Sequence, residues 1–214
     1  MSFGEFTEEP PEEGIRGVAT GIVTDNKDPE GMGRVQIRYP WRDEDQQSFW
    51  ARTARTMAGK DRGTYFLPEV DDEVLVAFEQ GDIHYPYVIG ALWSAAEKPP
   101  VDNADGKNNI RKIRSRSGHE ITLDDTERAE KVEIKTNAGH SVVLDDSTGG
   151  EKIQLKDKTG KNTIEFKSVP GDINIKSNLN VNVESKMITI KGTGNVTVEA
   201  GGILTLKGSL VKIN

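Results

Sequence analysis

The sequence has 214 residues, 34% of them hydrophobic and 22 of them glycine, which is poor for a large globular core and suits an elongated β structure. It holds no cysteine, so disulfides and thiol chemistry are excluded, and no apolar run approaches the roughly 18 residues that span a bilayer. The net charge of −7 divides into −5 for residues 1–14, −4 for 15–100 and +2 for 101–214, so no segment has the strongly basic balance typical of phosphate binding.

Residues 1–14 contain five glutamates and two prolines but no Lys or Arg. We predict a flexible acidic N-terminal arm, or a segment ordered only by a partner. Phe3 and Phe6 are either anchors in such an arm or chance occurrences. The segment lacks the basic and apolar regions of a signal peptide, so we expect no export by the general route.

Residues 15–95 predict a small β-barrel. Apolar and alternating runs predict five short strands, at 17–24, 34–39, 49–56, 73–78 and 86–93. The segments between them, such as 25–33 and 58–63, are rich in turn-forming or charged residues and read as loops. Five strands in about 80 residues fit a five-stranded oligonucleotide/oligosaccharide-binding barrel, the OB-fold. Residues 96–109, which include Pro99-Pro100, predict a linker.

Residues 110–170 hold a repeat with an offset of 21 residues. The stretch AEKVEIK, which begins at Ala129, recurs as GEKIQLK from Gly150. Gly118-His119 and Gly139-His140 have the same offset. Each unit predicts two strands, with a turn at an Asp-Asp pair and another at the glycine, and we expect a broad β-prism that narrows toward the C-terminus.

Residues 171–214 have a shorter period. Apolar residues come in pairs two apart, and successive pairs lie 7 or 8 residues apart, with Gly, Asn, Ser, Lys and Thr between them. A spacing of two places both side chains on one face of a strand, so we predict a ladder of very short strands. The predicted core residues are Ile173, Ile175, Val181, Val183, Ile188, Ile190, Val196, Val198, Leu204, Leu206, Val211 and Ile213.

These 12 side chains are too few to offset the conformational entropy of ordering the ladder in one chain, and an isolated ribbon leaves both edges unpaired. We expect several chains to wind around a shared apolar axis, and a homotrimer is the simplest closed arrangement. The alternative is a monomeric β-solenoid, which needs a wider coil than eight residues usually allow. The predicted fold class is all-β: a five-stranded OB-fold barrel followed by an intertwined trimeric β-helix or β-prism spike over 110–214.

Three sets of residues carry candidate chemistry. In a trimer, His119 and His140 would each contribute to a ring of three imidazoles, which is a candidate metal site. The alternative is that both are solvated turn residues, as Lys161 at the third equivalent position indicates. Asp124-Asp125 and Asp145-Asp146 resemble paired carboxylates for acid/base work, but adjacent strand residues point to opposite faces. The third set predicts a stacking and cationic face, and it consists of Trp41, Phe49, Trp50, Arg38, Arg42, Arg52 and Arg55. We expect no catalytic residue, no metal and no cofactor.

Four motifs follow one another along residues 33–93. They are a Gly-Arg-Val strand start, a Pro-x-x-x-Asp-Glu-Val strand, a Gly-Asp turn and a Pro-x-Val-x-Gly-x-Leu-Trp end. Here they are Gly33-Arg34-Val35, Pro68 with Asp72-Glu73-Val74, Gly81-Asp82, and Pro86 with Val88, Gly90, Leu92 and Trp93. In this combination the chain resembles the phage baseplate assembly protein V (central spike) family and the valine-glycine repeat (VgrG) proteins of type VI secretion. The C-terminal octads resemble the trimeric β-helix of the same proteins.

The resemblance implies a non-enzymatic homotrimeric spike of a contractile-tail baseplate, in a virion or in an extracellular or cytoplasm-assembled particle. Such a spike docks on a trimeric hub protein at the end of the tail tube and pierces the target cell envelope when the sheath contracts. The chain has no hub domain before the barrel and no His beyond His140, so we expect a separate hub and a PAAR-like tip protein, and no nucleic-acid partner. The alternative is a nucleic-acid- or glycan-binding OB module on a β-solenoid stalk, against which the acidic balance of residues 15–100 argues.

Overall fold

The structure, a computed structural model, describes residues 14–42 and 47–213, so the acidic segment with Phe3 and Phe6 lies outside the described residues. Regular structure in the described ranges is β apart from one 3-10 turn, which confirms the all-β prediction. Contacts between Cα atoms divide the chain into two compact units, with the boundary between Lys107 and Asn108. In the described ranges no helix is long and apolar enough to cross a membrane.

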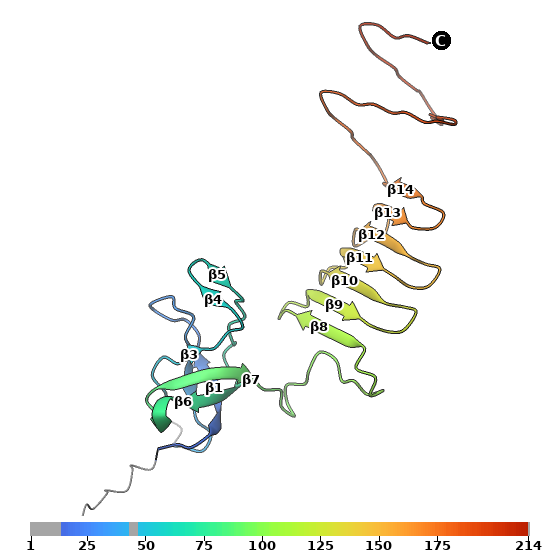
Figure 1. Ribbon diagram of the computed structural model, residues 1–214. Helices are drawn as coiled ribbons and strands as arrows, with labels where there is room; N and C mark the ends of the chain where they lie inside the picture. The colour runs from blue at the N-terminus through green and yellow to red at the C-terminus, as the bar shows by residue number, and fades with distance from the viewer. Residues whose placement is uncertain (1–13, 43–46, 214) are drawn as a thin grey trace, which may run out of the picture. The chain divides into compact units, whose positions relative to one another are not determined.

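The first unit is a curled five-stranded sheet with the strand order β2-β1-β6-β7-β3 (Figure 1). Its strands are β1 (Val18–Asp25), β2 (Gln36–Arg38), β3 (Arg52–Thr53), β6 (Glu73–Phe78) and β7 (Pro86–Ala91). Val35, next to β2, and Ala51, next to β3, exchange two backbone hydrogen bonds of 3.0 and 2.8 Å. Because β2 and β3 are the edge strands, this bridge joins the edges of the sheet, as a five-stranded OB barrel requires.

The curled sheet encloses a hydrophobic core. Its largest fully buried side chains are Val23, Val35, Ile37, Val74 and Val76. Burial alternates along β6, where Val74, Val76 and Phe78 face the core while the residues between them are half-buried. This is the period-2 pattern that the sequence predicts for the strand 73–78.

Two local predictions for the first unit were wrong. The predicted strand 49–56 is regular only at β3, because Ser48 pairs with Ile37 through both its backbone N–H and its hydroxyl instead of through a continuous ladder. The predicted loop 58–63 contains a hairpin of β4 (Ala58–Gly59) and β5 (Arg62–Gly63). Its tight turn includes Asp61 with a φ of 55°, a conformation that Asp tolerates better than most residues.

The second unit contains an antiparallel sheet of seven strands in chain order (Figure 1). They are β8 (Ile110–Arg114), β9 (Glu120–Asp124), β10 (Lys131–Lys135), β11 (Ser141–Asp145), β12 (Lys152–Lys156), β13 (Thr163–Lys167) and β14 (Ile173–Lys176). Every second strand begins 21 residues after the one before it: β8, β10, β12 and β14 begin at residues 110, 131, 152 and 173. The equivalent turns use Gly118, Gly139 and Gly160, whose φ angles of 88°, 99° and 70° favour glycine.

Beyond β14 the described chain continues without strands as far as residue 213 (Figure 1). The predicted ladder of short strands over 171–214 is therefore present in one chain only as β14. Its remaining pairs have no strand partner within the chain, and their pairing with sister chains stays a prediction.

Candidate assembly surface

One face of the seven-stranded sheet is almost entirely apolar. Because the strands pair in register, its apolar residues line up across the sheet in two columns. The first column contains Leu123, Val132, Leu144, Ile153, Phe166 and Ile173, and the second contains Ile113, Ile121, Ile134, Val142, Leu155, Ile164 and Ile175. We call these residues the apolar face.

The apolar face is open to solvent in a single chain. The exposed fractions of its side chains run from 38% for Val132 to 66% for Ile173, with only Val142 below that range. Monomeric soluble proteins rarely expose a contiguous apolar surface that crosses seven strands, since such a surface normally marks an interaction site. The apolar face is therefore the strongest candidate for an assembly surface among the described residues.

The opposite face of the same sheet is polar. It carries Lys112, Thr122, Glu133, Val143, Gln154, Glu165 and Asn174 in one column. Lys112 Nζ lies 3.1 Å from Glu120 Oε2 and lowers the pKa of that carboxyl, and Gln154 donates a 2.9 Å hydrogen bond to Glu165. This face can be solvated as it stands, so the sheet is amphipathic and needs a cover on one side only.

An open hollow of about 550 Å³ lies over the second apolar column. Leu155, Ile164 and Ile175 line it, together with Val181 from the segment that follows β14. The structure thus brings two of the predicted core residues, Ile175 and Val181, to the same hollow. Its walls suit apolar side chains from another segment.

The 12 predicted core residues are all exposed in the single chain. Their exposed fractions run from 51% for Leu204 and Val211 to 87% for Ile213. Ile173 and Ile175 belong to the apolar face, and the other ten continue its pattern beyond the sheet. The sequence prediction did not include the eleven apolar-face residues that precede Ile173, although the alternation in β9 to β13 carries the same signal.

His119 and His140 occupy equivalent turns and each accepts a hydrogen bond from the next turn. The Nδ1 atom of His119 accepts from the backbone N–H of Asn137, and that of His140 accepts from Lys158, both at 3.2 Å. At the third turn Asn162 Oδ1 accepts from the N–H of Asn178 at 2.9 Å. These side chains connect successive turns. In the described ranges no group of three His, Asp or Glu side chains could hold a metal ion.

The first aspartate of each pair, Asp124 or Asp145, caps a turn. Asp124 Oδ1 accepts hydrogen bonds from the hydroxyl of Thr126 at 2.5 Å and from its backbone N–H at 3.0 Å, and these bonds lower the pKa of Asp124. Asp145 has the same relation to Ser147, with a lowered pKa. Asp124 and Asp145 therefore act as turn-forming groups, because each carboxylate accepts hydrogen bonds from the residue two positions later.

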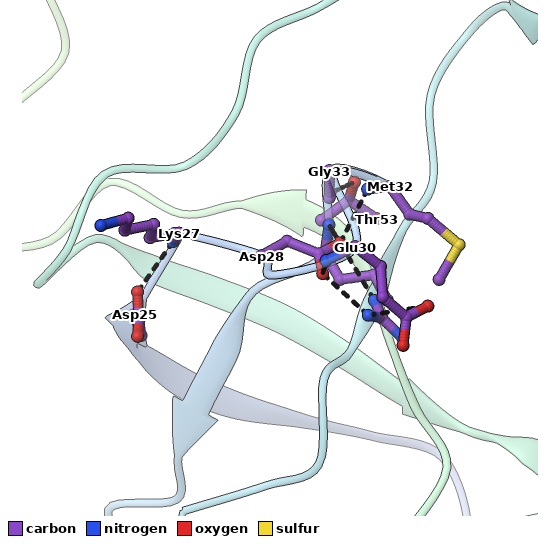
Figure 2. Close-up of polar contacts among 8 residues, drawn as sticks. Asp25, Lys27, Asp28, Glu30, Met32, Gly33 and Thr53 are labelled. Atoms are coloured by element: carbon purple, nitrogen blue, oxygen red, sulfur yellow. Dashed lines mark hydrogen bonds and ion pairs between the residues drawn. The ribbon is translucent and has the colours of Figure 1, made fainter.

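In the first unit, Asp28 organises the loop between β1 and β2 (Figure 2). Its carboxylate accepts backbone hydrogen bonds from Glu30 (3.0 Å), Met32 (2.9 Å) and Arg34 (3.2 Å). The guanidinium of Arg34 adds two more, at 3.0 and 2.7 Å, and holds the pKa of Asp28 well below its usual range. Thr53 Oγ1 donates to Gly33 O at 2.8 Å and ties the loop to β3. The loop is therefore connected both internally and to β3 by hydrogen bonds.

The predicted stacking and cationic face is divided by the structure. Phe49, Trp50 and Arg52 line one hollow, Trp41 and Arg42 line a second, and Arg55 lines a third beside the β4–β5 hairpin. Arg38 lines none of these. Sequence reasoning missed Arg34, which lies 6.0 Å from the Trp50 ring, and Tyr87, whose ring lies 5.7 Å from Arg52. Only tertiary packing brings these residues to the same hollow.

Comparison with known proteins finds a match for most of the first unit. Residues 19–93 match the model of the type VI secretion system/phage-baseplate injector OB domain. VgrG1a, a type VI secretion system spike protein of Pseudomonas aeruginosa, is 30% identical over 135 residues, which cover 56% of this chain and 21% of the relative.

Two further spike proteins show similar values. VgrG4b of P. aeruginosa is 31% identical over 136 residues (52% and 17% of the two chains), and VgrG3 of Vibrio cholerae is 27% identical over 111 residues (48% and 11%). The chain thus spans about a fifth or less of the length of these relatives. The match includes the motifs around Gly33, Pro68, Gly81 and Pro86. Residues 19–93 of the chain are thus similar to the type VI secretion system/phage-baseplate injector OB domain.

Proposed function

We propose that this chain is a non-enzymatic spike subunit of a contractile injection machine, in a phage-like baseplate or a type VI-like system, and that it works as a homotrimer. The observation that carries the proposal is the apolar face, which is open to solvent in one chain and lies in the sequence after a match to an injector OB domain. Three identical sheets can cover one another by turning their apolar faces toward a common axis. The polar faces then remain outside in water.

The same geometry explains how a spike withstands load. Each chain contributes its predicted core pairs from Ile173 to Ile213 to the axis, and backbone groups with no partner in one chain pair with sister chains. Unfolding one chain then requires all three to separate. A stiff rod of this kind transmits force along its axis, and that is the physical requirement for piercing a cell envelope.

The proposal includes two further partners and a location. The OB unit docks on a trimeric hub protein at the end of the tail tube, and a PAAR-like protein caps the spike. The working location is the baseplate of the assembled particle, and the target cell envelope is the surface that the spike meets on contraction. Mass spectrometry of purified particles would find this chain with a hub protein and a small tip protein, and particles without either of those would contradict this part.

Native mass in solution is the direct test of the homotrimer. Sedimentation equilibrium should give about three times 23.5 kDa, and the band should resist SDS until the sample is boiled. A species of 23.5 kDa at all concentrations, with a cooperatively folded second unit, would reject the trimer.

A nucleic-acid- or glycan-binding OB module remains the second candidate, favoured by the arginines that stack on Trp50 and Tyr87. Residues 15–100 carry 10 basic and 14 acidic side chains, which disfavours a phosphate backbone. Fluorescence titration with oligothymidylate separates the two functions. Tight binding that weakens steeply with salt would support the second.

A further inference from the structure

The described chain enters the first unit beside the 3-10 turn Glu79–Gly81. Ile15 donates a backbone hydrogen bond of 2.9 Å to Gly81 O, and a Cβ atom on Gly14 would lie 3.4 Å from Gly81 Cα. Ile15 and Ile83 also pack against the core. This fixes the point from which residues 1–13 depart.

One hollow adjoins that point, and a second hollow shares His84 with the first. The first, of about 540 Å³, is lined by Gly14, Trp41 and Arg42 among others. The second, of about 480 Å³, is lined by residues that include Phe49, Arg52, Tyr85 and Tyr87. The rings of His84 and Phe49 lie 5.8 Å apart, so the two hollows adjoin at these side chains. We call the combined surface the His84 groove.

The His84 groove offers uncovered aromatic rings beside arginines. Phe49, Tyr85 and Trp41 are 66%, 61% and 52% exposed. Arg42 lies in the first hollow and Arg52 in the second. The acids in the groove already accept hydrogen bonds, Glu79 from the Tyr87 hydroxyl and Asp82 from His84. The groove therefore suits a ligand that brings both aromatic rings and carboxylates.

Residues 1–13 have that chemistry and are attached beside the groove. They contain Phe3 and Phe6 with five glutamates and no Lys or Arg. Phe6 lies eight residues before Gly14, a reach of up to roughly 26 Å for an extended chain. Because the segment is tethered, its effective concentration at the groove is on the order of millimolar, so modest contacts suffice.

We propose that residues 1–13 bind in the His84 groove of their own chain, with a phenylalanine against its exposed rings and glutamates beside Arg42 and Arg52. This inference is independent of the trimer and of the piercing role. Its consequence is that the aromatic surface of the OB unit is covered by an acidic peptide unless a competitor displaces that peptide.

The absence of cysteine makes a cross-linking test specific. The full chain with Thr7→Cys and Tyr85→Cys is treated with a short bis-maleimide, boiled in SDS and mapped by mass spectrometry. The control pairs Thr7→Cys with Arg62→Cys, an exposed position on the β4–β5 hairpin of the same unit. We expect the intrachain link to Tyr85→Cys to form about tenfold faster than the control link, and adding Phe3→Ala and Phe6→Ala to reduce it to the control rate.

Equal rates for the two pairs would overturn the proposal, as would links found only between chains, which would assign the segment to a sister copy. Oligothymidylate offers a second check. A segment that occupies the groove competes with any other ligand there. Deletion of residues 1–13 should therefore raise the oligothymidylate affinity of a site mapped to Trp50 and Tyr85. Equal affinity before and after the deletion would also overturn the proposal.

Discussion

The two units of this chain place their apolar side chains differently. In the first unit, Val23, Ile37 and Val74 are fully buried in the interior of a sheet whose edges are joined. In the second unit the sheet has a single layer, and Leu155 and Ile164 are still 42% and 39% exposed. A curled sheet covers its own apolar face, whereas an open sheet needs another surface. The first unit therefore covers its own apolar side chains, whereas the apolar face of the second unit stays open within one chain.

The largest expected effect comes from a charged side chain placed on the apolar face of the second unit. Leu155→Lys would place an ammonium group beside Val142 and Ile164, where burial in a trimer leaves it unpaired. We expect the native mass to fall about threefold, from trimer to monomer. Gln154→Lys is the matched control, because it lies one residue away on the polar face opposite Glu165 and should leave the mass unchanged. Equal effects of the two substitutions would contradict a one-sided interface.

Truncation of one apolar side chain in each unit sharpens the comparison. Ile37→Ala removes a fully buried side chain and should cost the first unit about 2–5 kcal/mol at any protein concentration. Ile153→Ala, at a position 45% exposed in the single chain, should lower the melting temperature of the second unit by an amount that depends on protein concentration. Calorimetry over a hundredfold concentration range checks both. A concentration-independent loss for Ile153→Ala would mean that its contacts lie within one chain.

The Asp28 carboxylate should make the stability of the first unit depend on pH. The pKa of Asp28 is lowered from the ordinary value of 3.8, chiefly by the Arg34 guanidinium, so the carboxylate binds a proton less readily in the folded state than in the unfolded state. The stabilisation is complete above about pH 4 and declines as the pH falls toward the folded-state pKa. Asp28→Asn should lower the melting temperature at pH 7 by several degrees and flatten its decline below pH 4. Acid melts of the two proteins that run parallel would refute this role.

The turn histidines give the smallest expected effect, in the second unit. His140→Ala removes the acceptor of the Lys158 N–H and should cost about 1 kcal/mol per chain. His140→Asn supplies an oxygen acceptor, as Asn162 does at the next turn, and should recover part of that loss. Hydrogen exchange at the Lys158 amide reports the bond directly. Unchanged protection in His140→Ala would show that the bond contributes nothing.

Local periodicity predicted most strands because it depends only on neighbouring residues. The alternation in Glu73–Phe78 gave that strand its observed bounds, and the 21-residue offset appears as equal spacing of β8, β10, β12 and β14. The β4–β5 hairpin was missed because Gly59 and Gly63 lack the side chains by which strands are recognised. The pairing of Ser48 with Ile37 was missed because one of its two hydrogen bonds is accepted by the Ser48 hydroxyl instead of by a backbone carbonyl.

The sequence by itself determined that the regular structure is β, that residues 15–95 form a small barrel of short strands and that apolar residues alternate on one side of each strand. Tertiary structure decided what those residues become. Register aligned them into two columns, edge bridging at Val35 and Ala51 closed the first sheet, and no second layer covered the other. The physical reason is that alternation is a property of one strand, whereas register, closure and burial depend on hydrogen bonds and contacts between strands.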